Sequence, residues 1–258
     1  MTDPATSSTA PPSPAWQRDE LDANPHEHAD KQEKVRRMFA SIAHAYDMNN
    51  RVHSFGRDQA WRRTTVRHTD LKPTDRVLDV ACGTGDLSLL YAQAGAASVI
   101  GLDYTAEMLD IARERKAHPK VEYVQGDAQS LPYEDGSFDV LSIAFGLRNV
   151  GDPHTALAEF RRVLAPGGRV MILEFSEPGF APIRWGNDLY TKAIMPRTAA
   201  LLARDRSGAY AYLPKSVEKF LTREEMARSV ECAGFAHIEQ KTMTFGVCTL
   251  TKGVVQAA

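Results

Sequence analysis

Val77-Leu78-Asp79-Val80-Ala81-Cys82-Gly83-Thr84-Gly85-Asp86-Leu87 opens with β-branched and apolar residues, runs into a glycine-rich turn and continues toward a polar-then-apolar pattern. This order predicts a buried strand, a tight turn and the start of a helix. Gly83 and Gly85 can take backbone angles that other residues avoid, and they let a ligand approach the main chain closely. The helix that begins near Asp86 presents unpaired backbone N–H groups to the turn. The segment therefore predicts a nucleotide-type binding loop.

The residues around this turn indicate which ligand it binds. A dinucleotide fingerprint has a third glycine where this sequence has Ser88, and it places a pyrophosphate on the helix N-terminus. Asp79 and Asp86 flank the turn and would repel a pyrophosphate, whereas they suit a ligand with a cationic centre and an ammonium group. S-adenosylmethionine (SAM) has both. The pattern D-x-x-x-G-x-G resembles the first motif of class I SAM-dependent methyltransferases, and the alternative is an ordinary turn after a parallel strand.

Two further carboxylates follow the next two predicted strands. Asp103 ends the predicted strand 97–103, close to the offset of ~20 residues at which a second-strand carboxylate meets a ribose. Asp127 follows the predicted strand 121–125, where an acid can accept a hydrogen bond from the adenine amino group. Ligands of open α/β sheets bind beyond the carboxyl ends of the strands. Acids at three successive strand ends therefore strengthen the prediction of a SAM site.

The composition is ordinary for a globular protein. Of the 258 residues, 43% are hydrophobic and 25% are charged, and the length allows one sizeable α/β domain with extensions. The net charge of -2 argues against nucleic acid as a partner. No apolar run approaches the ~20 residues of a membrane-spanning helix, so we expect a cytoplasmic protein and leave contact at a membrane surface open. Cys82, Cys232 and Cys248 lack metal-site spacing, which predicts reduced thiols and no bound metal.

The chain divides into an N-terminal tail and one domain. Residues 1–30 are rich in Pro, Ser, Thr, Ala and acidic residues, which predicts a disordered tail in which His26 and His28 are solvated. Residues 31–258 form the predicted domain.

Two segments of this domain are expected on the substrate side. Residues 31–70 read as an N-terminal helical lid over the SAM site, in which Tyr46 and His53 are either substrate contacts or helix-boundary packing residues. Residues 176–220 break the alternation of strands and helices and mix aromatic with basic residues. We interpret them as an insertion that carries substrate specificity. It would either contact an anionic membrane surface or present a solvated charged face.

Several segments together resemble one family, the quinone-biosynthesis C-methyltransferases, which methylate demethylmenaquinol or, in ubiquinone-making organisms, a methoxy-polyprenyl-benzoquinol. The likeness extends from about Lys34 to Lys252. The segments that carry it are Phe39–Asp47, Asp79–Asp86, Phe145–Val150, Arg162–Gly168, Leu173–Ser176 and Tyr212–Val217. Phe-Gly-Leu-Arg-Asn and Tyr-Leu-Pro-x-Ser-Val are far more family-specific than the first motif. The resemblance implies a class I, Rossmann-like α/β fold: a mostly parallel seven-stranded sheet with helices on both faces.

The resemblance also implies a set of cofactor-binding residues. Thr84, Asp103, Asp127 and Ala128 stand where the family contacts SAM. Asp79, Gly83 and Gly85 of the first motif complete the predicted cofactor site. The sequence departs from some relatives at Ala144, where a serine also contacts SAM, and Ala144 is therefore left out of the set.

The chemistry of quinol methylation suggests three catalytic candidates. Methyl transfer from a sulfonium needs no acid for the leaving group, so catalysis depends on bringing donor and acceptor together and on making the acceptor nucleophilic. A hydroquinone ring carbon is a poor nucleophile until the neighbouring hydroxyl loses its proton. Arg148, just past the fourth predicted strand, is the candidate that stabilises this phenolate. Tyr46 and His53 are candidates for orienting the ring or relaying the proton.

The sequence leaves alternatives for the methyl acceptor and for the activity itself. The resemblance favours demethylmenaquinol, with 2-methoxy-6-polyprenyl-benzoquinol of the ubiquinone pathway as the alternative. An N- or O-methyltransferase acting on a small soluble acceptor would share every SAM motif, and a non-catalytic SAM-binding scaffold would share the fold. The polyprenyl tail of a quinol needs an apolar groove, which we expect between the lid and the insertion. The sequence leaves homodimer formation open.

Overall fold

A seven-stranded sheet forms the centre of the molecule. The structure is a computed structural model and describes residues 15–256 except 17, 23, 196 and 199–208. The strand order is β3-β2-β1-β4-β5-β7-β6, in which β1 to β5 run parallel and β7 is antiparallel to both of its neighbours. This confirms the predicted mostly parallel sheet. The strands are β1 (Arg76–Val80), β2 (Ser98–Asp103), β3 (Val121–Gln125), β4 (Phe138–Ala144), β5 (Leu164–Phe175), β6 (Phe235–Met243) and β7 (Cys248–Val255).

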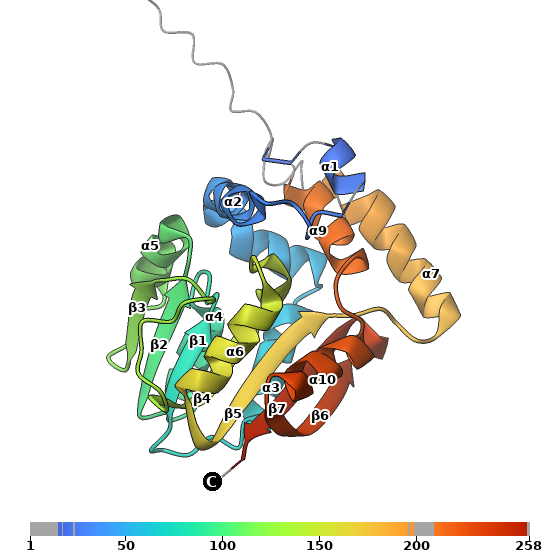
Figure 1. Ribbon diagram of the computed structural model, residues 1–258. Coiled ribbons are helices and arrows are strands. Elements are labelled where there is room, and N and C mark those ends of the chain that lie inside the picture. Colours follow the sequence, from blue (N-terminus) through green and yellow to red (C-terminus); the bar gives the residue numbers. More distant parts are fainter. Residues whose placement is uncertain (1–14, 17, 23, 196, 199–208, 257–258) are drawn as a thin grey trace, which may run out of the picture.

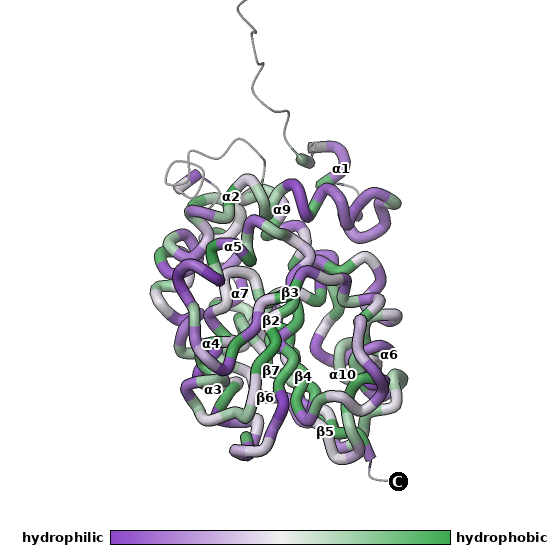
Figure 2. The backbone as a smooth tube through the Cα atoms, turned by 90° about the vertical axis from the view of Figure 1, so that its left-hand side faces the viewer, coloured by the Kyte–Doolittle hydropathy of each residue, from purple (hydrophilic) through white to green (hydrophobic). Residues whose placement is uncertain are grey.

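Helices cover both faces of the sheet (Figures 1 and 2). Side chains alternate between the two faces along each strand, so Leu78 and Val80 pack with α6 and α10, while Val77 packs with α3 and α4. The helices are α1 (Arg18–Asp22), α2 (Lys31–His53), α3 (Arg57–His68), α4 (Asp86–Gln93), α5 (Ala106–Arg115), α6 (Pro153–Val163), α7 (Ala181–Leu189), α9 (Ala209–Glu218) and α10 (Arg223–Cys232). Short helical turns are η1 (Leu147–Asn149), η2 (Tyr190–Ile194) and η3 (Thr244–Gly246).

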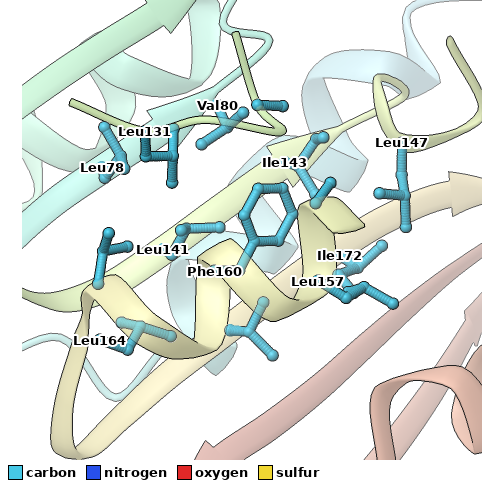
Figure 3. Packing of buried hydrophobic residues seen from close by; sticks show 14 of the residues in the cluster. Leu78, Val80, Leu131, Leu141, Ile143, Leu147, Leu157, Phe160, Leu164 and Ile172 are labelled. Carbon is cyan, nitrogen blue, oxygen red and sulfur yellow. The ribbon is translucent and has the colours of Figure 1, made fainter. Parts of the chain in front are cut away.

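The larger part of the core lies between the sheet and α6. Leu157 and Phe160 of α6 are fully buried, and they pack with Leu141 and Ile143 of β4 (Figure 3). This packing anchors the central strands, whose carboxyl ends build the candidate site.

The expected disordered tail is wrong for residues 15, 16, 18–22 and 24–30, which fold against the domain. Trp16 is 2% exposed and stacks on Tyr212 of α9 with ring centroids 4.9 Å apart. Leu21 is buried in the same cluster. His26, expected to be solvated, is half-buried and its Nε2 lies 2.8 Å from the carbonyl oxygen of Ser216. A few apolar anchors outweigh the polar composition here, because each buries a large side chain. Residues 1–14 lie outside the described part.

The predicted lid and insertion lie together above the strand ends. α2 crosses the carboxyl edge of the sheet, with α9 beside it and α7 at the periphery (Figure 1). The described part of the insertion is helical, which agrees with the predicted break in the alternation of strands and helices; residues 199–208 are not described. The described chain contains no helix that is long and apolar enough to cross a membrane. The three cysteines are free, as predicted.

Candidate active site

A small cavity lies at the carboxyl ends of β1, β2 and β4. Its volume is about 90 Å³, and Val80, Gly83 and Asp103 are among the residues that line it. The lid helix α2 covers it and contributes Gln32 and Phe39 to the lining. The cavity therefore occupies the crevice in which the sequence places SAM.

The glycine-rich loop beside this cavity is fixed by hydrogen bonds and by lack of space. Gly83, with φ 57°, donates its N–H to Asp103 Oδ2 at 2.8 Å, and the N–H of Thr105 donates to Oδ1 at 2.8 Å. Gly85 has φ 85°, and a Cβ on it would lie 2.8 Å from Cζ of Tyr123. Both the backbone angle and the close approach therefore require glycine at position 85. Each carboxylate oxygen of Asp103 retains acceptor capacity for a ligand hydroxyl.

Asp127 and Ala128 also line the small cavity, as the resemblance implies. Asp127 Oδ2 accepts a hydrogen bond from Nε2 of Gln32 at 2.7 Å, and Oδ1 accepts one from the N–H of Gln129 at 2.9 Å. Because Gln32 belongs to α2, this contact joins the lid to the end of the third strand.

Asp79, also a predicted cofactor residue, is not among the residues that line the small cavity. It is 1% exposed, and its two oxygens accept hydrogen bonds from Ser88 Oγ at 2.6 Å and Ser142 Oγ at 2.8 Å. Ser88 lies on α4 and Ser142 on β4, so the carboxylate ties the first strand to the next helix and to its neighbouring strand. Its role is to hold the loop in place.

Thr84 and Gly85 also lie outside the lining of the small cavity. Thr84 is buried, and its hydroxyl donates to Asp47 Oδ1 of the lid at 2.5 Å. The hydroxyl of Thr84 therefore connects the loop to α2, and Gly85 provides the turn. The spacing of the motif finds the right loop, but it does not distinguish ligand contacts from residues that shape the loop.

A second, larger cavity of about 190 Å³ adjoins the first. Phe39, Tyr46 and Phe145 line both cavities and form the boundary between them. The larger cavity extends from α2 and α3 to α7, η2 and α9, which is where the sequence predicts an apolar groove between lid and insertion. All three predicted catalytic residues, Tyr46, His53 and Arg148, line it.

Arg148 is buried in an ion pair. Its Nη1 donates to Glu174 Oε1 at 2.5 Å and to the carbonyl oxygen of Phe145 at 2.7 Å. Arg148 is 4% exposed and Glu174 5% exposed, so the two charges compensate each other away from water. Nε of Arg148 has no partner. The guanidinium thus has a donor to offer, whereas its charge is largely neutralised.

Tyr46 and His53 are both uncharged polar groups in this cavity. Burial raises the pKa of Tyr46, which therefore keeps its phenolic proton at neutral pH. Burial lowers the pKa of His53. Nδ1 of His53 lies 3.3 Å from the hydroxyl of Tyr190, and Nε2 is buried without a partner. Neutral groups of this kind can orient a polar ring or relay a proton.

The model of the "ubiE/COQ5 methyltransferase family" matches residues 27–255 of this chain. The chain belongs to this family. It is 41% identical over 225 residues to "Demethylmenaquinone methyltransferase" of Clavibacter sepedonicus, which covers 87% of this chain and 91% of that relative. It is 40% identical over 232 residues to "Ubiquinone/menaquinone biosynthesis C-methyltransferase UbiE" of Campylobacter jejuni, with coverages of 85% and 97%.

A solved SAM-dependent methyltransferase from Thermotoga maritima superposes on this methyltransferase with a TM-score of 0.62 at 20% identity, covering 85% of this chain and 99% of that one. At this identity the likeness concerns the fold alone. It agrees with the class I, Rossmann-like architecture that the sequence predicts.

The buried carboxyl of Asp79 should make the stability of this methyltransferase depend on pH. Burial raises the pKa of Asp79 from its ordinary 3.8 to about 6, against the opposing hydrogen bonds from Ser88 and Ser142. Because the folded-state pKa is the higher one, the protonated carboxyl stabilises the fold fully below about pH 4. This contribution, about 3 kcal/mol, is lost as the pH rises through 6.

Asp79→Asn should remove this pH dependence. Measured by urea unfolding of the ligand-free protein between pH 4 and pH 8, the stability of the variant relative to wild type should rise by about 2–3 kcal/mol with increasing pH. A difference that stays constant over this range would show that the carboxyl of Asp79 is not shifted.

The sequence analysis missed the contribution of α3 to the larger cavity. Asp58, Trp61 and Arg62 line it, and all three are buried. A signal was present, because positions 58, 61, 62 and 65 repeat at helical spacing and so share one face. Asp58 and Arg62 are charged, and charged residues are seldom buried, so their place on this face was not recognised.

Proposed function

We propose that this methyltransferase transfers the methyl group of SAM to a ring carbon of a polyprenyl quinol, with demethylmenaquinol as the acceptor. The observation that carries the proposal is the pair of adjoining cavities: a small one beside the glycine-rich loop and a larger one, lined largely by apolar side chains, behind Phe39, Tyr46 and Phe145. The names of the relatives from Clavibacter sepedonicus and Campylobacter jejuni agree with this acceptor class.

The residues of the small cavity fit SAM. Asp103, at the end of β2, would accept hydrogen bonds from vicinal hydroxyls, and Asp127 would accept one from an amino group. Ala128 and Met108 would provide apolar contacts for a base. The space beside Gly83 is open to a ligand. A Cβ added to Gly83 would lie 3.9 Å from Cε1 of Tyr46, its nearest neighbour. When bound, SAM supplies an activated methyl group on a positively charged sulfur.

The side chains at the boundary of the two cavities would position the acceptor and exclude water from it. A quinol ring in the larger cavity would lie among Trp61, Phe145 and Phe175, whose rings contact one another with centroids 4.6 to 6.1 Å apart. Arg148 would donate an N–H to a ring oxygen, while Tyr46 and His53 would orient the ring or relay its proton. The reaction would convert quinol and SAM into methylated quinol, S-adenosylhomocysteine and one proton.

An in vitro assay with radiolabelled SAM tests this function. Chemically reduced demethylmenaquinol and 2-methoxy-6-polyprenyl-benzoquinol are offered separately in detergent, and label in each quinol is measured. We expect label in demethylmenaquinol. Label in both would mean that the head-group pocket accepts either ring. Label in neither, with SAM binding intact, would refute the proposal and favour a soluble acceptor.

We further propose that α7 contacts a membrane surface from which the quinol is drawn. None of the residues of α7 is buried, although the helix carries large apolar side chains. Phe180, which caps the helix, is 65% exposed, Trp185 71% and Leu189 49%. The next residues, Tyr190 and Thr191, line the larger cavity. An exposed apolar helix next to a cavity for a lipid-soluble substrate fits an interfacial position.

Trp185→Ser/Leu189→Ser should weaken binding to vesicles of mixed zwitterionic and anionic phospholipids at least ~10-fold, because two apolar side chains no longer leave water. Vesicle co-sedimentation measures this. The same double variant should keep its kcat toward a demethylmenaquinol analogue with a single isoprene unit, since that acceptor needs no membrane. Unchanged sedimentation would rule out α7 as the contact surface.

A further inference from the structure

Arg62 is a buried arginine without a compensating charge. It lies on α3, is 7% exposed and lines the larger cavity. Its Nε has no hydrogen-bond partner. No carboxylate in the described part of the chain forms an ion pair with Arg62 within 4.0 Å. Burying a lone charge is costly, so a buried cation of this kind calls for an anionic partner.

The other buried arginines do have such partners. Arg148 is paired with Glu174, and Arg169 with Asp75. Asp58, one turn before Arg62 on α3, accepts instead from Ser54 Oγ at 2.8 Å and from Nε2 of Gln59 at 3.0 Å. Arg62 therefore differs from its counterparts in having its charge available to the cavity.

The position of Arg62 places that charge next to the boundary between the cavities. Its Cζ lies 5.4 Å from the ring centroid of Phe145, and the ring of Phe145 lines both cavities. Cζ of Arg148 lies 5.3 Å from the ring centroid of Phe175, which contacts Phe145. Each ring of this aromatic pair therefore has a guanidinium group beside it, and in the described part of the chain only that of Arg148 is paired with a carboxylate, Glu174.

Arg62 has no ion-pair partner among the described side chains, but its positive charge acts on neighbouring groups, and it helps to lower the pKa of Asp86 on α4. Burial raises the pKa of Tyr46, and the positive charge of Arg62 is the largest effect that opposes this rise. The same charge acts against the raised pKa of Asp79. The titratable and charged groups that line the cavity around Arg62 are Tyr46, His53, Asp58, Arg148, Glu177, Asp188, Tyr190, Tyr212 and Glu218. Outside this lining, the charge of Arg62 also acts on Asp79, Asp86 and Cys248.

We propose that Arg62 binds the ionised oxygen of the acceptor ring and holds its negative charge while the neighbouring carbon becomes nucleophilic. The proposal rests on the proposed function and specifies how the site favours a phenolate. Arg62 supplies the charge, and the neutralised Arg148 supplies a directional N–H donor. The proton of the hydroxyl leaves to solvent, and no further reactant is needed. A full charge in a water-poor cavity stabilises an oxyanion more strongly than a neutral donor does.

A spectroscopic titration tests this assignment without requiring turnover. The probe is 4-methoxy-1-naphthol, a naphthoquinol monomethyl ether whose ionisation changes its ultraviolet spectrum, kept free of oxygen and bound to the protein saturated with S-adenosylhomocysteine. We expect the pKa of the bound probe to lie at least about one unit below its value in water, a tenfold shift in the ionisation equilibrium. Arg62→Gln should abolish the shift, and Arg62→Lys should restore most of it. Arg63→Gln, which changes the exposed neighbouring arginine, should leave it intact.

Activity provides the second readout. Arg62→Gln should lower kcat for quinol methylation about 100-fold at neutral pH and move its pH profile upward, because the phenolate then forms only at higher pH. The affinity for SAM should change less than about twofold, since Arg62 does not line the small cavity. A merely structural role would lower stability without moving the pH profile.

The outcomes separate this inference from the proposed function. If wild type binds the probe without lowering its pKa, the role of Arg62 is refuted, whether or not any variant folds. If wild type lowers the pKa of the probe but methylates neither quinol, the proposed function fails while the anion site remains. If wild type methylates a quinol and Arg62→Gln keeps its kcat and pH profile, Arg62 is not the phenolate ligand.

Discussion

Asp103→Ala is expected to weaken the affinity for SAM about 100-fold, because two hydrogen bonds from ligand hydroxyls to a carboxylate are worth about 1.5 kcal/mol or more each. The carboxylate lines the small cavity, and it also accepts the N–H groups of Gly83 and Thr105. Its loss therefore removes ligand contacts and releases the glycine-rich loop that it holds. Isothermal titration calorimetry with SAM measures the change.

Asp110→Ala is the matched control, because Asp110 is an exposed carboxylate on α5 whose partner is Arg113 on the same surface. It should bind SAM as wild type does. Asp103→Asn preserves the shape of the side chain but can accept only through one oxygen, and we expect an intermediate affinity. An affinity of Asp103→Ala within threefold of wild type would mean that the small cavity is not the SAM site.

Arg148→Ala is expected to destabilise the fold by about 3–5 kcal/mol, because it leaves the carboxylate of Glu174 buried without a partner. Glu174 is 5% exposed, and among the described side chains its only cationic ion-pair partner is Arg148. Urea unfolding measures the loss. A fall in activity of this variant would therefore mix catalytic and structural effects.

The double variant Arg148→Gln/Glu174→Gln separates the two effects. It replaces the ion pair by two neutral amides that can hydrogen-bond to each other, so most of the stability should return. If Arg148 contacts the acceptor, kcat should remain about 100-fold low in this folded variant with SAM and quinol saturating. Normal turnover would show that the Arg148–Glu174 pair is structural and would leave Arg62 as the cation of the site.

The local pattern of the sequence was sufficient to locate the loop and the acids beside the small cavity. Apolar runs that end in Asp103 and Asp127 predict parallel strands, and the carboxyl ends of parallel strands meet at one edge of a sheet. Gly83 and Gly85 mark the loop, because its backbone angles exclude most other residues. Such signals depend on neighbours in the sequence, so they can be read without knowing the tertiary contacts.

The surroundings of Asp79 and Trp16 depend on how separate segments of the chain pack together. Asp79 points toward Ser88 and Ser142 rather than into the cavity, and its facing is decided by how β1 packs between α4 and β4. Trp16 is anchored by Tyr212, almost two hundred positions later in the chain. Composition averages over such a segment and hides a single large apolar side chain.

The amino-acid sequence by itself determined the class of fold, the glycine-rich loop, the acids at the strand ends and the segments that cover them. Only the tertiary structure decided that Arg148 is neutralised by Glu174 whereas Arg62 is not. The physical reason is that the charge presented by a buried arginine depends on which carboxylates the fold brings within a few ångströms. The distance between an arginine and a carboxylate in the fold cannot be derived from residue type and spacing along the chain.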